Sequence, residues 1–261
     1  MRNLVVMRRA WKIVKTVALA VFAGLALLLV YEVVTFPRVW RLKDANPETT
    51  AMIEIRAREA RERGEQPRRV QQWVPLSQIS VNLQRAVLAG EDTNFATHNG
   101  FDYQSIQRAW DEAQREAAKE AKEAGEDPAE SWIPAMPSFK RGASTVTQQL
   151  AKNLYLSSER SFVRKAREAA ITYFLEKHLS KRRILEIYLN VIEWGDGIYG
   201  AEAAARTYFG KSAASLTPQE AAFLSAIIPN PRTEFNPKLH PRRVARRQRG
   251  SLRGMPYVRV P

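Results

Sequence analysis

The chain has no cysteine and only three histidines in its 261 residues. The missing cysteines exclude disulfides and thiolate metal sites, and they fit an oxidising compartment as well as a reducing one. His178 and His240 have no partner at a metal-ligand spacing. The sequence also lacks the HExxH, GxxxxGK[ST] and GxSxG patterns. Zinc hydrolysis, P-loop phosphate chemistry and a serine-hydrolase elbow therefore have no support.

Sustained strand alternation and internal repeats are also missing. Helical patterns instead follow one another almost without a break from residue 144. The predicted helices cover 144–156, 161–179, 181–192, 198–209 and 217–228. Thr217 to Glu220 reads as a capping box with proline at the first helical position, and an earlier helix is expected over Val81 to Glu91. We therefore predict an all-α domain.

One long apolar run, from Thr16 to Val34, is interrupted only by Glu32. Nineteen helical residues can cross a hydrocarbon core of about 30 Å. Five cations lie in the preceding segment 1–15, which by the positive-inside rule is a cytoplasmic tail. A cleaved signal peptide is the alternative, but the run is long and no small-residue cleavage site follows it. We predict an uncleaved anchor over 16–34, with the rest of the chain outside the cytoplasm.

The formal net charge of +14 favours anionic membrane surfaces or other polyanions. Nucleic acid is not expected, because the domain would lie outside the cytoplasm. Residues 35–72 form a charged juxtamembrane stalk or outer layer, with a helix ending near Gly64. The basic tail 233–261 contains "RRVARRQRGSLR", which is either an amphipathic helix packed on the domain or a lipid-binding patch.

Three polar clusters could carry chemistry. "EDTNFATHNGFD" (91–102) follows an apolar run, and it is either a solvated helix end or a site. In "RGASTVTQQLAKN" (141–153), a helix capped by Ser144 would place Thr145, Gln149 and Lys152 on one face. That face could seat an anion, or it could belong to an ordinary surface helix.

The third cluster is "ERSFVRKAREA" (159–169), where Arg164 and Glu168 are four residues apart and Arg160 lies one turn earlier. A surface ion pair is its plainest interpretation. Taken together, Glu91, Glu168 and these cations suit glycosyl chemistry on an anionic substrate. The residues alone lead no further.

These clusters and two later blocks resemble, in order and spacing, the conserved blocks of the peptidoglycan glycosyltransferases of family 51. The later blocks are "KRRILEIYLNVIEWGDGIYGAEAAARTYFGK" and "LTPQEAAFLSAIIPNP". The resemblance covers about residues 73–232. It implies a helical, lysozyme-like domain with a membrane-associated jaw over 103–140, where "SWIPAMPSF" is apolar. No transpeptidase sequence follows, so a monofunctional member is expected.

The resemblance also implies the site. Glu91 matches the general base, and Glu168 matches a second carboxylate that positions the donor. Lys152, Arg160 and Arg164 would hold the donor pyrophosphate. Further substrate-binding positions are Asp92, Phe95, His98, Ser144, Thr145, Gln148, Gln149 and Asn153.

Family members polymerise lipid II into β-1,4-linked glycan by an inverting displacement of undecaprenyl pyrophosphate. The expected partners are lipid II, the lipid-linked strand, the membrane and other cell-wall synthases, at a bacterial inner membrane with the catalytic domain in the periplasm. No metal site or obligatory cofactor is expected, although Mg²⁺ or Mn²⁺ could act at Glu168. The rival functions are a glycan hydrolase or lytic transglycosylase and a tethered scaffold without activity.

Overall fold

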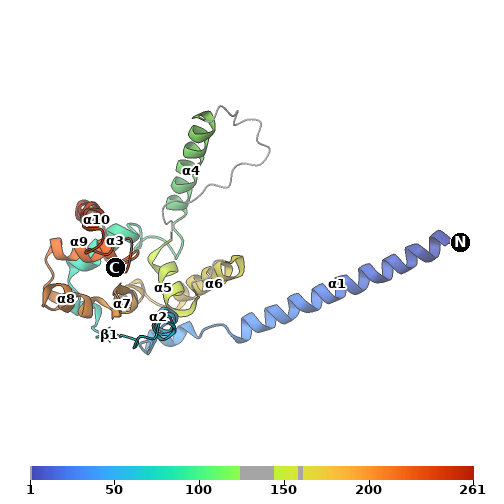
Figure 1. Ribbon diagram of the computed structural model, residues 1–261, viewed down its shortest axis with the longest axis horizontal. Coiled ribbons are helices and arrows are strands. Elements are labelled where there is room, and N and C mark those ends of the chain that lie inside the picture. Colours follow the sequence, from blue (N-terminus) through green and yellow to red (C-terminus); the bar gives the residue numbers. More distant parts are fainter. Residues whose placement is uncertain (1, 124–143, 158–160) are drawn as a thin grey trace. The chain divides into compact units, whose positions relative to one another are not determined.

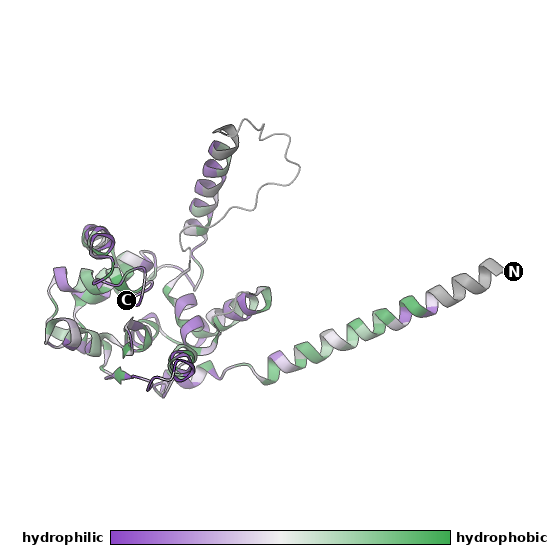
Figure 2. Cartoon of the chain, viewed as in Figure 1, coloured by the Kyte–Doolittle hydropathy of each residue, from purple (hydrophilic) through white to green (hydrophobic). Residues whose placement is uncertain are grey.

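The computed structural model describes residues 2–123, 144–157 and 161–261. The chain divides into two compact units, Met1–Arg38 and Val39–Pro261. Among the described residues, the first unit holds one helix, α1 (Arg2–Val34), and the part of it that is coloured in Figure 2 is mainly apolar. By length and composition it is long and apolar enough to cross a membrane. The sequence-predicted anchor is thus a helix and a candidate membrane span.

The described part of the second unit is mainly helical, which confirms the all-α prediction (Figure 1). Its helices are α2 (Ala51–Glu62), α3 (Val81–Glu91), α4 (Tyr103–Glu123), α5 (Val146–Tyr155), α6 (Phe162–His178), α7 (Lys181–Val191), α8 (Ala201–Phe209), α9 (Pro218–Ile227) and α10 (Pro241–Gly254). Short 3₁₀ turns are η1 (Val39–Lys43), η2 (Leu76–Gln78), η3 (Ala213–Ser215) and η4 (Met255–Tyr257).

A small sheet was not foreseen from the sequence. It joins β1 (Val70–Gln71), β2 (Glu193–Gly195) and β3 (Ile198–Tyr199) in the order β1-β3-β2. β1 runs parallel to β3, with Val70 opposite Ile198, and β2 runs antiparallel to β3. Strands of two or three residues are too short to show a period-two pattern, and this is why the sequence did not reveal them.

Two helical groups build the core and carry the site between them. α3 packs against α9 and α10, while α5 packs against α6 and α7. Leu83 and Val87 of α3 and Leu150 of α5 are completely buried. Burial on this scale is the main stabilising term of the fold, at roughly 25 cal/mol per Å² of apolar surface.

The second unit includes both charged segments that flank the region of sequence resemblance. α2 packs against α5, and the Nε of Arg56 donates to the Glu193 carboxylate at 3.0 Å. The segment 39–72 is therefore an outer layer of the unit and not a separate stalk. Within 233–261, α10 packs on α3 and α9, which confirms the amphipathic-helix interpretation of the basic tail.

Candidate active site

Glu91 is the last residue of α3, and its side chain is only 8% exposed. Gln149 of α5 donates from Nε2 to Glu91 Oε2 at 2.9 Å. Arg247 of α10 donates from Nη2 to Oε1 and, at 3.1 Å, to the backbone oxygen of Gly90. The hydroxyl of Tyr188 of α7 donates to Gln149 Oε1 at 2.7 Å and so fixes which way the amide points. Four helices thus hold one carboxylate in a single orientation.

The surroundings of Glu91 tune its proton affinity. Burial raises the pKa of Glu91, Arg247 and Gln149 oppose the increase, and the neighbouring Asp92 adds to it. The net result is a carboxylate with a pKa above its ordinary value. A carboxylate tuned upward, with lone pairs still able to accept a hydrogen bond, suits a general base at neutral pH.

Sequence reasoning missed Arg247 and Tyr188. Tyr188 lies in a block interpreted as scaffold, and Arg247 lies in the basic tail. The only sequence signal for Arg247 was a cation inside an amphipathic helix, and nothing in that pattern names its partner 156 residues away.

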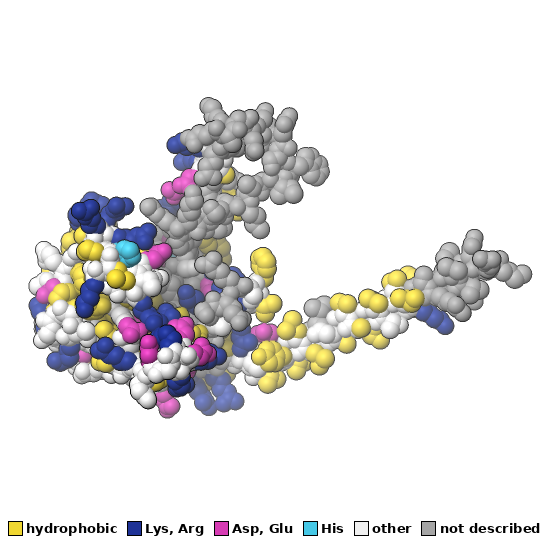
Figure 3. Space-filling model, in the orientation of Figure 1, with side chains coloured by type: hydrophobic (Ala, Val, Ile, Leu, Met, Phe, Trp, Pro, Cys, Tyr) yellow, Lys and Arg dark blue, Asp and Glu magenta, His cyan; other side chains and the backbone are white. Residues whose placement is uncertain are grey.

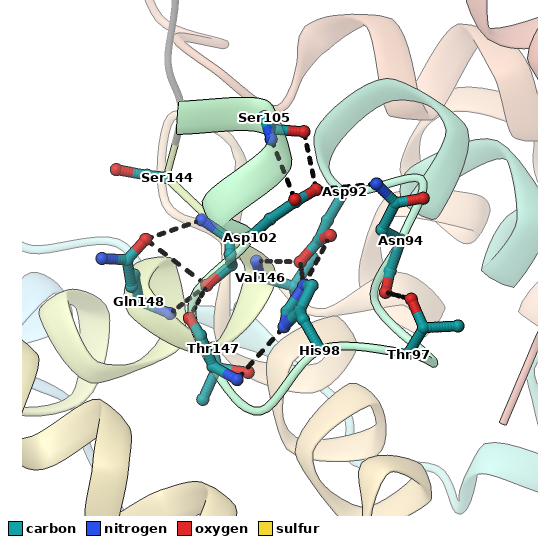
Figure 4. A network of polar contacts seen from close by, with 12 residues as sticks. Asp92, Asn94, Thr97, His98, Asp102, Ser105, Ser144, Val146, Thr147 and Gln148 are labelled. Atoms are coloured by element: carbon teal, nitrogen blue, oxygen red, sulfur yellow. Dashed lines mark hydrogen bonds and ion pairs between the residues drawn. The ribbon is translucent and has the colours of Figure 1, made fainter. Parts of the chain in front are cut away.

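A second network, beside Glu91, joins three segments of the chain (Figure 4). Asp92 Oδ2 accepts from the backbone N–H of Val146 at 2.9 Å, at the N-terminus of α5. His98 Nε2 lies 2.9 Å from Asp92 Oδ1, while His98 Nδ1 accepts from the Gly100 N–H at 3.1 Å. Since Nδ1 is the acceptor, the neutral ring carries its proton on Nε2 and donates to Asp92. This network fixes α5 to the end of α3.

The N-terminus of α5 differs by one residue from the prediction, because Thr145 and not Ser144 caps it. Gln148 N–H donates to Thr145 Oγ1 at 3.2 Å, and Thr145 N–H donates to Gln148 Oε1 at 2.9 Å. The Thr145 hydroxyl also donates to the backbone oxygen of Gly100 at 2.7 Å. These reciprocal bonds satisfy orphan groups at the helix start and tie it to the loop after His98.

Replacing Thr145 with Ala is expected to destabilise the protein by about 2 kcal/mol, since a helix cap and a buried hydrogen bond are both lost. Chemical denaturation of the two proteins measures this difference. Thr145→Ser keeps the hydroxyl and serves as the control. Equal losses in both variants would show that the methyl group, and not the cap, stabilises this site.

Two predicted substrate-binding residues, Phe95 and Gln148, make contacts within the protein framework. Phe95 is completely buried, with the Lys181 ammonium 4.5 Å from its ring centre, and the Gln148 amide is used by the cap. The Phe95 ring therefore has no exposed surface for a ligand in this conformation. Asp92, His98 and Thr145 likewise have polar groups bound within the protein, and their predicted contacts with substrate stay predictions.

A pocket of about 210 Å³ opens beside Glu91. Its lining residues come from the end of α3, the start of α4 and the start of α5: Ala89, Gly90, Glu91, Asp92, Thr93, Asp102, Ser105, Ser144 and Thr145. The sequence-predicted Ser144 is among them. Asp102, which was not predicted, accepts from Ser105 Oγ at 2.6 Å and from Asn94 Nδ2 at 2.8 Å. The pocket could hold a polar group next to the Glu91 carboxylate.

Glu168 of α6 is 4% exposed and lies among cations. Its Oε2 accepts from Arg164 Nη1 at 2.8 Å, and its Oε1 accepts from Lys165 Nζ at 2.5 Å. The pair is therefore not an ordinary exposed ion pair, which was the plainest interpretation of the sequence. Burial lowers the pKa of Lys152, Glu168 raises it, and Arg164 lowers it. Arg160 lies outside the described residues.

α5 connects the two carboxylates. Gln149 bonds Glu91, and Lys152, three residues later, lies in the electrostatic field of Glu168. The amide of Asn153 donates to the Gln149 backbone oxygen at 2.8 Å and so is held against the same helix. The predicted face of α5 therefore exists at Gln149 and Lys152, while Thr145 belongs to the cap.

The donor set around Glu168 does not fit a divalent cation in this conformation, because both carboxylate oxygens already accept from side-chain cations. In the described part of the chain, no three His, Asp or Glu side chains are grouped as metal ligands.

Known proteins resemble most of this chain. The family model described as Transglycosylase matches residues 58–125 and 130–256. A biosynthetic peptidoglycan transglycosylase of Azoarcus sp. strain BH72 is 43% identical, over 93% of this chain and 95% of that protein. One of Thiobacillus denitrificans is 44% identical, over 94% of this chain and 98% of that protein. The family match begins inside α2 and includes all of α10, so it extends beyond the blocks recognised in the sequence.

Proposed function

This chain belongs to the transglycosylase family and is a peptidoglycan glycosyltransferase. We propose that it polymerises lipid II into β-1,4-linked glycan strands, with undecaprenyl pyrophosphate as the leaving group. The observation that carries the proposal is that α5 contacts a buried carboxylate at one position and lies among cations at another. Gln149 contacts a buried carboxylate with a raised pKa, and Lys152 lies among the cations around Glu168.

Glu91 acts as the general base in this proposal. The sugar 4-hydroxyl of the acceptor enters the pocket beside Glu91 and gives its proton to the carboxylate as the oxygen attacks the anomeric carbon of the donor. A single displacement inverts the α-linked donor to a β-linked product. Arg247 and Gln149 keep the carboxylate aimed at this proton.

The cations on the other side act on the leaving group. Charge grows on the pyrophosphate as the glycosidic bond breaks, and Lys152 and Arg164 offset it. Arg164 Nε is buried and has no protein partner among the described residues, so a movement of this side chain toward the donor would bring an unused N–H to a phosphate oxygen. Glu168 holds Arg164 and Lys165 in position and is therefore a positioning residue for the donor.

Polymerisation of purified lipid II by the full-length protein in detergent tests the proposal, with the glycan chain lengths resolved on a gel. Long strands support it. If lipid II stays intact while purified glycan strands are shortened, the protein is a hydrolase or lytic transglycosylase. Pyrophosphate-binding cations serve no purpose in such an enzyme, which is why polymerisation is favoured. A tethered scaffold would leave both substrates unchanged.

Chelation with EDTA is expected to leave the polymerisation rate within about twofold of its original value, because the cations around Glu168 already supply the charge that a metal would bring. The rate before and after chelation, with Mg²⁺ or Mn²⁺ added back, measures this. Loss of activity that only a divalent cation restores would contradict the expectation and would mean that Glu168 exchanges its present partners for a metal.

Replacing Arg247 with Met is expected to lower kcat/KM on the order of 30-fold, since a charged hydrogen bond to a buried carboxylate contributes about 2 kcal/mol. Arg247 holds the pKa of Glu91 down against burial and Asp92. Its removal should therefore move the acid limb of the pH–rate profile to higher pH. Arg247→Lys keeps the charge and should keep the limb near its original position. An unchanged limb in Arg247→Met would limit Arg247 to a packing role.

The membrane placement is part of the proposal. α1 would be a single-pass anchor of a bacterial inner membrane, with the N-terminus cytoplasmic because of its cations and the catalytic unit periplasmic. This arrangement would hold the site where a lipid-linked substrate is displayed. The apolar part of the predicted jaw, "SWIPAMPSF", lies outside the described residues, and contacts with other cell-wall synthases stay a prediction.

A further inference from the structure

The outward face of α10 carries a line of arginines. Arg242, Arg246, Arg249 and Arg253 follow one another at intervals of four, three and four residues, which keeps them on one side of the helix. All four are exposed. The line, which we call the arginine stripe, runs over about 16 Å at 1.5 Å per residue. Lys and Arg side chains gather over α10 in the space-filling view (Figure 3).

The opposite face of α10 fixes the direction of the arginine stripe. Val244 and Ser251 are buried against the neighbouring helices. Gln248 donates to the backbone oxygen of Gln219 at 2.9 Å, and Arg247 donates to Gly90 at 3.1 Å. The helix therefore cannot roll, and the stripe stays directed outward.

Such a stripe has an electrostatic cost. Like charges three or four residues apart destabilise a helix, and α10 contains no acidic residue to offset them. Among the described residues, no carboxylate forms an ion pair with any of the four arginines. By contrast, Arg58 and Arg61 of α2 are also exposed and three residues apart, but acidic residues are interspersed along that helix. The arginine stripe thus presents positive charge without internal neutralisation.

We propose that the arginine stripe binds the anionic phospholipid headgroups of the membrane that holds α1. A guanidinium forms paired hydrogen bonds with phosphate oxygens and keeps its charge at any physiological pH. A straight row of such groups suits a flat anionic surface. The candidate membrane span adds the second argument, because a tethered unit meets headgroups at a high effective concentration. The two sequence interpretations of this tail, a packed helix and a lipid-binding patch, then describe its two faces.

The test uses the absence of cysteine in the chain. Gly250, which is exposed and adjoins the stripe, is replaced with Cys, because a Cβ there meets no atom within 4 Å. The full-length protein is labelled with an environment-sensitive fluorophore and placed in nanodiscs. One set contains phosphatidylcholine alone, and the other also contains phosphatidylglycerol. Quenching by spin-labelled lipid reports contact between α10 and the bilayer.

We expect quenching in the anionic nanodiscs and little in the neutral ones. Replacing Arg246 and Arg249 with Gln should lower the ratio of membrane-bound to free α10 about 30-fold, since each arginine near an anionic surface contributes about 1 kcal/mol. Replacing Arg58 and Arg61 with Gln is the matched control, which removes the same charge from another helix and should change the ratio little.

Equal quenching in the two lipids, or an equal loss in the control, would overturn the proposal. A fluorescence response to poly-glutamate, with none to anionic lipid, would instead assign the stripe to an acidic protein partner. Because the readout does not use polymerisation, a failure here leaves the proposed enzymatic function untouched.

Discussion

Glu91→Gln is expected to lower the rate of lipid II polymerisation about a thousandfold, because an amide cannot take the acceptor's proton. The amide has nearly the same shape as the carboxylate, and its one oxygen can still accept from Arg247, while its NH2 group replaces the oxygen that accepts from Gln149. Lipid II binding should therefore persist. Rates and chain lengths from purified wild type and variant, with lipid II binding measured in parallel, check this.

The thermal stability of the same variant should depend less on pH than that of the wild type. Burial raises the folded-state pKa of Glu91 above its unfolded value. The folded state therefore binds this proton more tightly, and the associated stability is present below the unfolded pKa and lost as pH rises through the folded one. Because glutamine has no titrating proton, the variant does not lose this stability as the pH rises. Thermal unfolding of both proteins at acidic and neutral pH tests the sign, and polymerisation at the wild-type rate would exclude Glu91 as the base.

Glu168→Gln is expected to lower kcat/KM about a hundredfold. The larger part of this loss should come from weaker binding and slower departure of the pyrophosphate. Glu168 is the acceptor for both Arg164 and Lys165, and these cations would repel each other without it. Its charge also raises the pKa of Lys152. The basic limb of the pH–rate profile should therefore move to lower pH, because Lys152 would lose its proton sooner.

Glu176→Gln is the matched control on the same helix. Glu176 accepts from Thr147 at 2.5 Å and from Lys181 at 2.7 Å, in a structural contact away from the cations of the site. The Glu176→Gln variant should be less stable than the wild type and should keep the wild-type pH–rate profile. If both variants show the same profile and the same activity, Glu168 contributes to folding and not to donor positioning.

Local sequence signals determined much of the helical framework. The predicted helix Val81–Glu91 matches α3 at both ends, because Ser80 caps it at 3.1 Å through Asn82 N–H and apolar residues recur on one face. The capping box at Thr217 and Glu220 likewise begins α9 as predicted. These signals act over three or four residues, so a sequence displays them directly.

The sequence by itself indicated the apolar anchor and three polar clusters through local patterns of residue types, and its resemblance to the family selected Glu91, Glu168 and the cations near them within those clusters. Only the tertiary structure decided what surrounds those groups. The contact of Arg247 with Glu91, the support of Gln149 by Tyr188 and the burial of Phe95 join residues from different helices. Such contacts depend on how helices pack across the whole domain, and no short stretch of sequence encodes that packing.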